Sequence, residues 1–237
     1  MKGGGILTLK NKLIISVYIP VALTLGVFAQ LTSGNAWSAV CYSLILLDFV
    51  LALLLFKKNK AAYFTLAALL FTAIADFFLV ASQPDREVLG VLFFIPAQLF
   101  WFLCVYISEE NGKRRKIHLF VRIVFNVLSL FVPLLVLGEG ADFLSVISVV
   151  YFANILLNAI FSLALVKRFP LLSLGLVLFL LCDIFVGLGS IDNYLKIEVG
   201  SFVFRLTHTG LNMPWIFYAP SQILLTLSMI ETKKDGC

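Results

Sequence analysis

Eight long apolar runs alternate with short polar connections along the chain. Each run holds about 17–24 residues, enough for a helix that rises about 1.5 Å per residue to cross a hydrocarbon core of roughly 30 Å. The pattern therefore predicts an all-α integral membrane protein with a single transmembrane domain over residues 1–237. The predicted spans are Leu13–Leu31, Trp37–Phe56, Ala61–Ser82, Val88–Ser108, Ile117–Gly138, Phe143–Val166, Leu171–Ser190 and Pro214–Ile230.

The composition agrees with this pattern. Hydrophobic residues make up 61% of the 237 residues, charged residues only 13%, and the mean hydropathy is +1.04, so lipid is the expected solvent. The net charge of +5 does not indicate nucleic-acid binding, because no basic face with interleaved aromatic residues occurs. The first run is too long for a cleaved signal peptide and lacks an A-x-A site, so we expect it to remain as a helix.

Lysine and arginine residues gather in alternate connections, which predicts the orientation. Arg86, Lys196 and Arg205 fall on one side, whereas fourteen others fall on the other side, so both termini are predicted to be cytoplasmic. Arg122 lies inside the fifth run near its basic end and is expected to snorkel toward the membrane surface. The fourteen are Lys2, Lys10, Lys12, Lys57, Lys58, Lys60, Lys113, Arg114, Arg115, Lys116, Lys167, Arg168, Lys233 and Lys234.

An internal repeat is also visible. Ile45–Lys58 at the end of the second run resembles Ile155–Arg168 at the end of the sixth, which aligns Asp48 with Asn158. The third and seventh runs each contain an aspartate, and the fourth and eighth each contain a Pro-x-Gln sequence, with prolines expected to break both helices. The sequence thus predicts two four-helix repeats of common orientation, related by an axis along the membrane normal. These repeats are residues 13–108 and 117–230, and the two Pro-x-Gln sequences are Pro96-Ala97-Gln98 and Pro220-Ser221-Gln222.

Several polar residues are predicted to share one layer at or just outside the membrane midplane. A carboxylate costs about 2.5–3.5 kcal/mol at the centre of a spanning helix, so such groups are expected inside the bundle or in a wet cavity. The layer, placed by helical rise, comprises Asp48, Asp76, Asp183, Gln98, Gln222, Asn154, Asn158, Tyr218 and Ser221.

The two aspartates of the third and seventh runs suggest acid–base chemistry. Two neighbouring carboxyl groups tend to share a proton, which places a general acid beside a general base. The amides of Gln98 and Gln222 are then expected to orient a water molecule or a substrate oxygen. The same groups also fit a non-catalytic role as interhelical hydrogen bonds, which is common for Asn and Gln in membrane helices.

Other chemistries have less support. The only histidines, His118 and His208, lie outside the polar layer, which argues against a histidine-ligated zinc site. Ser221 is an alternative nucleophile, but no histidine base accompanies it. No nucleotide-binding, G-x-S-x-G or H-E-x-x-H motif occurs, and we expect neither a metal nor a cofactor. Of the cysteines, Cys41, Cys104 and Cys182 are expected in the core, and Cys237 does not fit a prenylation motif.

Four segments in order resemble the YhhN-like lysoplasmalogenase family of eight-span membrane proteins. The resemblance rests on Ala75-Asp76 in the third span, Ala97-Gln98 with Trp101 in the fourth, Cys182-Asp183 in the seventh, and Tyr218 with Gln222 in the last. The family typically has Gly-Asp, a small residue before His or Gln, Ser-Asp and Tyr…Gln at these places. Ala75, Cys182 and Gln98 therefore depart from the commoner residues, whereas both aspartates are retained.

The resemblance implies hydrolysis of the vinyl ether bond of lysoplasmalogens to a fatty aldehyde and a glycerophospho-base. In that reaction Asp76 and Asp183 are expected to be the acid–base pair. Positioning of water and the ether oxygen is expected from Gln98, Gln222, Tyr218, Asp48 and Asn158, and binding of the phosphate headgroup from Arg86, Lys196 and Arg205. The expected partners are a lysophospholipid substrate and membrane lipid, and the expected location is a bacterial plasma membrane.

Two other functions fit the same sequence. A transporter or lipid flippase fits the repeat and the paired prolines. A non-catalytic scaffold or lipid sensor fits if the aspartates only stabilise the bundle. The long connection Ile191–Met213 is either a lid lying in the membrane interface, with Phe202, Phe204 and Leu206 on its apolar side, or a simple connection.

Overall fold

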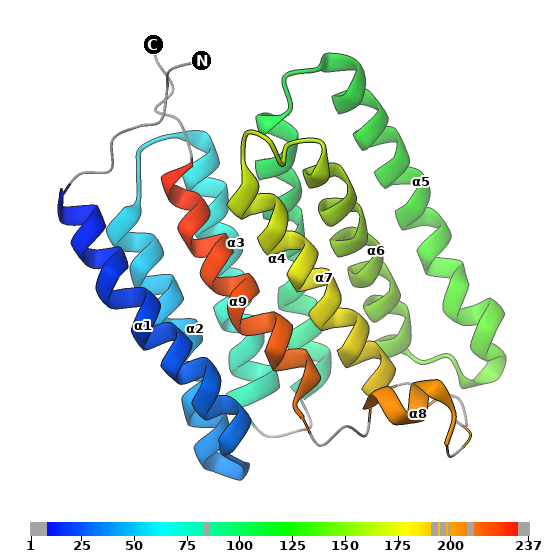
Figure 1. Ribbon diagram of the computed structural model, residues 1–237. Helices are drawn as coiled ribbons and strands as arrows, with labels where there is room; N and C mark the ends of the chain where they lie inside the picture. The colour runs from blue at the N-terminus through cyan, green and yellow to red at the C-terminus, as the bar shows by residue number, and fades with distance from the viewer. Residues whose placement is uncertain are drawn as a thin grey trace.

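The computed structural model describes residues 9–82, 86–190, 194, 198, 200–207 and 211–231. Within these residues all regular structure is helical, and eight helices are long and apolar enough to cross a membrane, which confirms the predicted spans (Figure 1). They are α1 (Leu9–Leu31), α2 (Gly34–Leu55), α3 (Lys60–Asp76), α4 (Glu87–Ser108), α5 (Gly112–Leu137), α6 (Phe143–Leu163), α7 (Pro170–Ser190) and α9 (Met213–Leu227).

Short elements complete the chain. A π-helix, η1 (Phe77–Ala81), extends α3, and a six-residue helix, α8 (Phe202–Thr207), lies in the connection between α7 and α9. Two 3₁₀ turns, η3 (Gly138–Gly140) and η5 (Ser228–Ile230), follow α5 and α9. Residues that bear on the predictions above but lie outside the described part are Lys2, Lys196, His208, Lys233, Lys234 and Cys237.

Helix boundaries follow local capping more closely than hydropathy. The α5 helix begins at Gly112, five residues before the predicted span, because the Asn111 side chain accepts hydrogen bonds from the amides of Lys113 and Arg114. The α6 helix begins after a capping box of Asp142 and Ser145, as hydropathy predicts, but it ends at Leu163 rather than at Val166. Contrary to expectation, Pro96 and Pro220 do not break α4 or α9, which continue through them.

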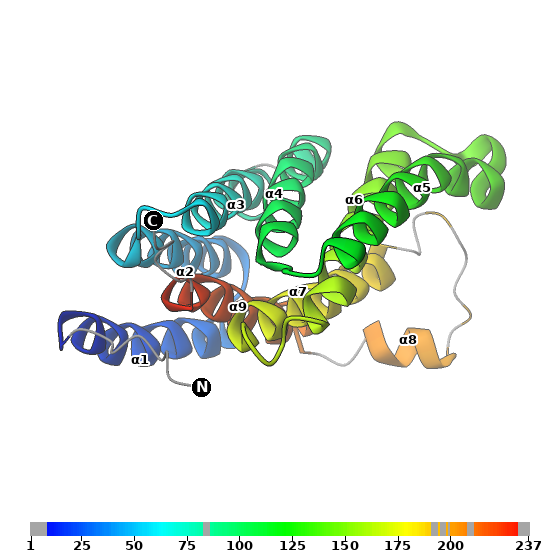
Figure 2. The ribbon, with the colours of Figure 1, turned by 90° about the horizontal axis from the view of Figure 1, so that it is seen from above.

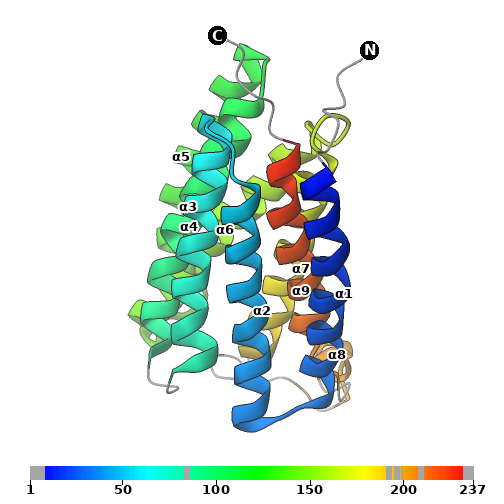
Figure 3. The same ribbon diagram turned by 90° about the vertical axis from the view of Figure 1, so that its left-hand side faces the viewer.

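Seven of the spanning helices form a closed ring. Following contacts around it, the order is α1, α2, α3, α4, α6, α7 and α9, and α9 contacts α1 and α2 to close the circuit. Figure 2 shows this arrangement along the helix axes, with α5 outside the ring against α6. Figure 3 shows α1, α2 and α9 side by side on one flank. The ring interior is where buried polar side chains from different helices meet.

One end of the bundle carries most of the described basic residues. The α2–α3 and α6–α7 connections, with Lys57 and Arg168, and the start of α5, with Lys113–Lys116, lie at the same end as the start of α1 and the end of α9 (Figure 1). We call this the basic end, and use "outer" for positions farther from it. The cytoplasmic location of this end and the division into two repeats remain predictions.

The basic end is held together by contacts between distant segments. The carboxylate of Glu231, just after α9, accepts hydrogen bonds from the amides of Leu171 and Leu172 in the first turn of α7. The Lys57 ammonium donates to the carbonyl of Ile230 at 3.0 Å. Burial raises the pKa of Glu231, and the two amide donors oppose that rise. These contacts fix the end of α9 against α2 and α7.

Close helix approach depends on glycine at two places. A Cβ atom at Gly90 of α4 would lie 2.4 Å from Leu79 Cγ of η1. At Gly175 of α7 it would lie 2.8 Å from Leu225 Cγ and 3.1 Å from the Leu225 backbone nitrogen of α9. Small residues allow such backbone contact in membrane proteins. The Ser221 hydroxyl uses this proximity to donate to the Gly175 carbonyl at 3.0 Å.

We predict that Gly175→Ala separates α7 from α9 and lowers the free energy of unfolding by about 1–3 kcal/mol, because the added methyl overpacks the contact. Gly187→Ala on the same helix is the control, since its Cβ would meet nothing within 4 Å. Thermal unfolding in detergent measures both. Equal stability of the two variants would contradict the packing argument.

Candidate active site

Two tyrosine–aspartate pairs lie in the outer part of the ring. The Tyr218 hydroxyl of α9 donates to Oδ2 of Asp76 at the end of α3, and the Tyr151 hydroxyl of α6 donates to Oδ2 of Asp183 in α7. Asp76, Tyr218 and Tyr151 are buried, and Asp183 is partly exposed. We call these four residues the outer tier. Each carboxyl group is thus held by a donor from a different helix.

Aromatic rings join the two pairs. Phe94 of α4 has its ring centroid 5.4 Å from that of Tyr151 and 5.9 Å from that of Phe179 in α7. The Phe179 ring in turn lies 5.7 Å from the Tyr218 ring. Asp76 also interacts electrostatically with Asp183. The structure therefore brings the two carboxyl groups predicted from the third and seventh spans into one largely apolar interior.

A second set of polar residues lies closer to the basic end. The Tyr18 hydroxyl of α1 donates to Oδ1 of Asp48 in α2, and Asn158 of α6 donates to Gln98 of α4. These four residues form the inner tier, and all are buried. Asn158 follows Tyr151 by seven residues, an axial distance of about 10 Å. The Asp48 carboxyl group is close enough to that of Asp76 for their charges to influence each other.

The glutamines predicted to position reactants have free donors. Within the described chain, neither Nε2 of Gln98 nor Nε2 of Gln222 has a hydrogen-bond partner, although both residues are buried. Gln222 lies one helical turn inward of Tyr218 on α9. The Ser221 hydroxyl donates its hydrogen bond to the Gly175 carbonyl, which supports a role in helix packing rather than that of a nucleophile.

The structure contradicts the predicted position of Arg122. The side chain does not snorkel to the surface but lies 6% exposed between α5 and the ring. It donates to Oδ1 of Asn154 and Oδ1 of Asn158, both at 2.5 Å, and its Cζ lies 4.2 Å from the Phe102 ring centroid. The two asparagines supply acceptors inside the bundle, so the guanidinium has no need to reach the headgroups. His118, one turn earlier, is also buried, and its Nε2 lies 3.4 Å from Arg122.

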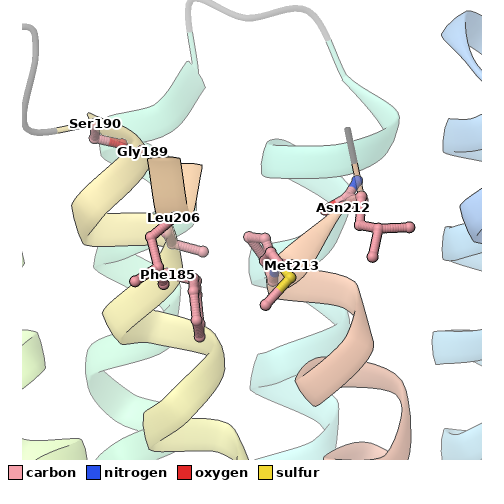
Figure 4. A pocket seen from close by; sticks show the side chains of 9 residues that line it. Phe185, Gly189, Ser190, Leu206, Asn212 and Met213 are labelled. Carbon is pink, nitrogen blue, oxygen red and sulfur yellow. The ribbon is translucent and has the colours of Figure 1, made fainter. Parts of the chain in front are cut away.

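A pocket of about 330 Å³ opens outward of the outer tier, between the outer ends of α7 and α9 (Figure 4). Phe185 and Val186 line it two and three residues after Asp183, and Pro214 lines it four residues before Tyr218. Leu206 of α8 closes one side. The remaining lining residues are Gly189, Ser190, Leu211, Asn212 and Met213. The pocket is therefore adjacent along both helices to the residues of the outer tier.

The predicted headgroup residues lie in the outer connections where the structure describes them. Arg86 is exposed and precedes the first residue of α4, and Arg205 is exposed in α8, where its Nε donates to the Gly200 carbonyl. Lys196 lies outside the described residues. Leu206 of the predicted lid faces the pocket, whereas Phe202 is 78% exposed.

The backbone changes immediately after Asp76. The Ser82 amide donates to the Phe77 carbonyl at 2.8 Å, five residues back, and this wider turn defines η1. Short π-helical turns inside α-helices occur frequently at functional sites. The wide turn changes the register between Asp76 and the outer residues Phe77–Ala81.

A family model described as the YhhN family matches residues 35–229, which is most of the chain. The chain belongs to the YhhN family. This confirms the resemblance seen in the sequence. No curated protein and no solved structure matches the chain at a significant level.

The YhhN match covers both aspartates of the outer tier and their tyrosine partners. Tyr18, which holds Asp48, precedes the matched region. Sequence reasoning identified Tyr218 but missed Tyr18 and Tyr151. Each is a tyrosine in a largely apolar run, where hydropathy treats it as an ordinary aromatic residue.

We predict that Tyr218→Phe and Tyr151→Phe each lower the free energy of unfolding by about 1–3 kcal/mol, because a carboxyl group inside the bundle loses a hydrogen-bond donor. Tyr63→Phe, at a side chain 54% exposed, is the control. A double-mutant cycle of Tyr218→Phe with Asp76→Asn is expected to give a coupling energy that Tyr63→Phe does not. If the effects of Tyr218→Phe and Asp76→Asn were additive, the hydrogen bond between these residues would not contribute to stability.

Proposed function

We propose that this YhhN protein hydrolyses the vinyl ether bond of lysoplasmalogens, or of a closely related lysolipid. The observation that carries the proposal is the outer tier, in which two aspartates from different helices are each held by a tyrosine and share an aromatic interior. Family membership supports the same reaction class. Opening a vinyl ether needs an acid, a stabilising carboxylate and a water molecule, but no strong nucleophile.

In the proposed reaction, one aspartic acid transfers its proton to the β-carbon of the vinyl ether. This leaves an oxocarbenium ion, which the second carboxylate stabilises at close range in a low-dielectric interior. Water then adds to the cationic carbon and gives up a proton to a carboxylate, forming a hemiacetal. Cleavage of the carbon–oxygen bond to glycerol, with proton transfer to the leaving oxygen and from the hemiacetal hydroxyl, yields a fatty aldehyde and a glycerophospho-base.

The tyrosines position the carboxyl groups in this scheme. Each hydroxyl donates to Oδ2 of its aspartate, which leaves Oδ1 for proton exchange with the substrate. Asp183 is partly exposed, whereas Asp76 is 4% exposed. Such a difference in environment is how paired carboxyl groups divide the acid and base roles.

Substrate access is proposed to occur from the outer end. The pocket, whose lining on α7 begins two residues beyond Asp183, would admit the lysolipid, and the alkenyl chain would lie among the aromatic side chains of the ring. Arg86, Lys196 and Arg205 would attract the phosphate at this end. With both termini cytoplasmic, and two repeats packed in common orientation, the pocket would face the outer leaflet of a bacterial plasma membrane.

We predict that Asp76→Asn and Asp183→Asn each reduce turnover by about 10²–10⁴-fold, because each removes a proton-transfer group. Asp142→Asn is the matched control, since Asn replaces Asp equally well as an exposed helix cap. The assay incubates purified protein with a lysoplasmalogen or an acyl lysophospholipid, and measures aldehyde against fatty acid.

Other results would replace the proposal. Full turnover in either aspartate variant would remove that residue from catalysis. Lipid or solute flux across sealed liposomes without aldehyde release would favour a transporter or flippase. If the aspartate variants lost stability and the wild type formed no product, a scaffold or lipid sensor would be favoured.

A further inference from the structure

The hydrogen bonds around Gln98 have a direction that the residue types determine. Arg122 carries only donors, so the Asn154 and Asn158 atoms that it contacts must be the acceptor oxygens. The Asn158 oxygen therefore faces Arg122, and its amide nitrogen faces α4. That nitrogen lies 2.9 Å from both Oε1 and the backbone carbonyl oxygen of Gln98.

The orientation of Gln98 follows from that of Asn158. Because an amide nitrogen donates, the atom of Gln98 that meets it must be the carboxamide oxygen. The Gln98 nitrogen is consequently turned away from Asn158. The backbone carbonyl reinforces this assignment, since it too accepts from the Asn158 nitrogen. Arg122 on one side and the α4 backbone on the other thus exclude the flipped arrangement of either amide.

The Gln98 nitrogen, which points away from Asn158, has no acceptor in the described chain, although Gln98 is 0% exposed. A buried donor without a partner costs about 1–3 kcal/mol, and the cost is avoided when a bound molecule supplies an oxygen. Structural hydrogen bonding between α4 and α6 accounts for the Gln98 oxygen but not for the nitrogen. A purely interhelical role therefore explains the hydrogen bond of the Gln98 oxygen, but it leaves the buried nitrogen without a partner.

We propose that Arg122 and Asn158 are positioning residues that hold Gln98 as a hydrogen-bond donor to the oxygen of a bound water molecule. The proposal deepens the proposed hydrolysis, on which it rests for the identity of that water. It also assigns the Gln98 role more narrowly than the sequence did, because it excludes Gln98 as the residue that contacts the ether oxygen.

The chemistry of the reaction separates the two oxygens. The ether oxygen becomes electron-poor when the β-carbon is protonated, so a donor hydrogen bond to it would oppose the reaction. A water molecule can instead accept from the Gln98 nitrogen, donate a proton to a carboxylate, and attack the cation through its second lone pair. A fixed donor is thus suited to the water and unsuited to the ether oxygen.

Asn158→Asp is the sharpest test, because it preserves size and reverses polarity. The new carboxylate keeps its contact with Arg122, but it also places an oxygen against the Gln98 backbone carbonyl, so kcat is measured well below the unfolding temperature of the variant. The carboxylate lacks an N–H group, so the Gln98 carboxamide is expected to rotate and donate to it, which withdraws the donor from the water. We expect kcat to fall about 3–10-fold with KM unchanged. Asn111→Asp, at the exposed cap of α5, is the control.

Substitutions of Gln98 give a second kinetic test. Gln98→Glu can accept from Asn158 but, when ionised, cannot donate, and it is expected to lose kcat like Asn158→Asp. Gln98→His can accept through one ring nitrogen and donate through the other, and it is expected to retain most of kcat. Equal kcat values for the Glu and His variants, or an effect of Asn158→Asp on KM rather than kcat, would overturn the proposal.

A measurement without turnover separates this inference from the proposed hydrolysis. The chain has four glutamines, Gln30, Gln83, Gln98 and Gln222, so side-chain ¹⁵N labelling of glutamine gives a simple spectrum. We expect the Gln98 carboxamide signal to shift in Asn158→Asp, while the distant Gln30 signal stays in place. An unchanged Gln98 signal would refute the positioning role, whereas absence of aldehyde from the wild type would refute only the hydrolysis.

Discussion

A polar group inside a lipid-solvated bundle must find its hydrogen-bond partner on another helix or in an enclosed water molecule, because lipid supplies none. The ring meets this constraint with pairs that each join two helices: Tyr18 with Asp48, Tyr218 with Asp76, and Tyr151 with Asp183. Arg122 follows the same rule from outside the ring. Two of these pairs join helices that are neighbours in the ring, and the Tyr218–Asp76 pair crosses the interior from α9 to α3. The arrangement of the bundle and the geometry of the candidate active site therefore depend on the same contacts.

Location inside the bundle was predictable from the sequence, but exact depth and direction around each helix were not. Counting residues from the ends of the apolar runs placed Asp76, Asp183 and Gln98 in one layer, whereas the structure buries all three or nearly so but puts Gln98 in the inner tier and both aspartates in the outer tier. The same counting failed for Arg122, because a position near a basic end is compatible with either the lipid or the bundle. The hydrogen bonds that Arg122 donates to Asn154 and Asn158 of α6 are what place its side chain in the bundle rather than in the lipid.

The partners of the aspartates were harder to predict than the aspartates. A charged residue in an apolar run is conspicuous, whereas Tyr151 resembles the many aromatic residues that simply pack. Its role depends on α6 and α7 lying side by side with matched heights, which is a tertiary property. The prolines of α4 and α9 show the converse: their local effect was overestimated, since both helices continue through them.

The π-helical turn after Asp76 divides α3 and η1 into two parts with separate registers. Each residue of an α-helix advances about 100° around the axis. Removal of one residue from Phe77–Ala81 would restore ordinary α-helical winding. The residues beyond the deletion would rotate by about 100° around the helix axis, while the part of α3 that carries Asp76 kept its position. Leu79 would then leave Gly90, and the contact between η1 and α4 would be rebuilt while the Asp76 carboxyl group stayed in place. Chain length at this point is therefore a way to change the packing of η1 against α4 without moving the acid.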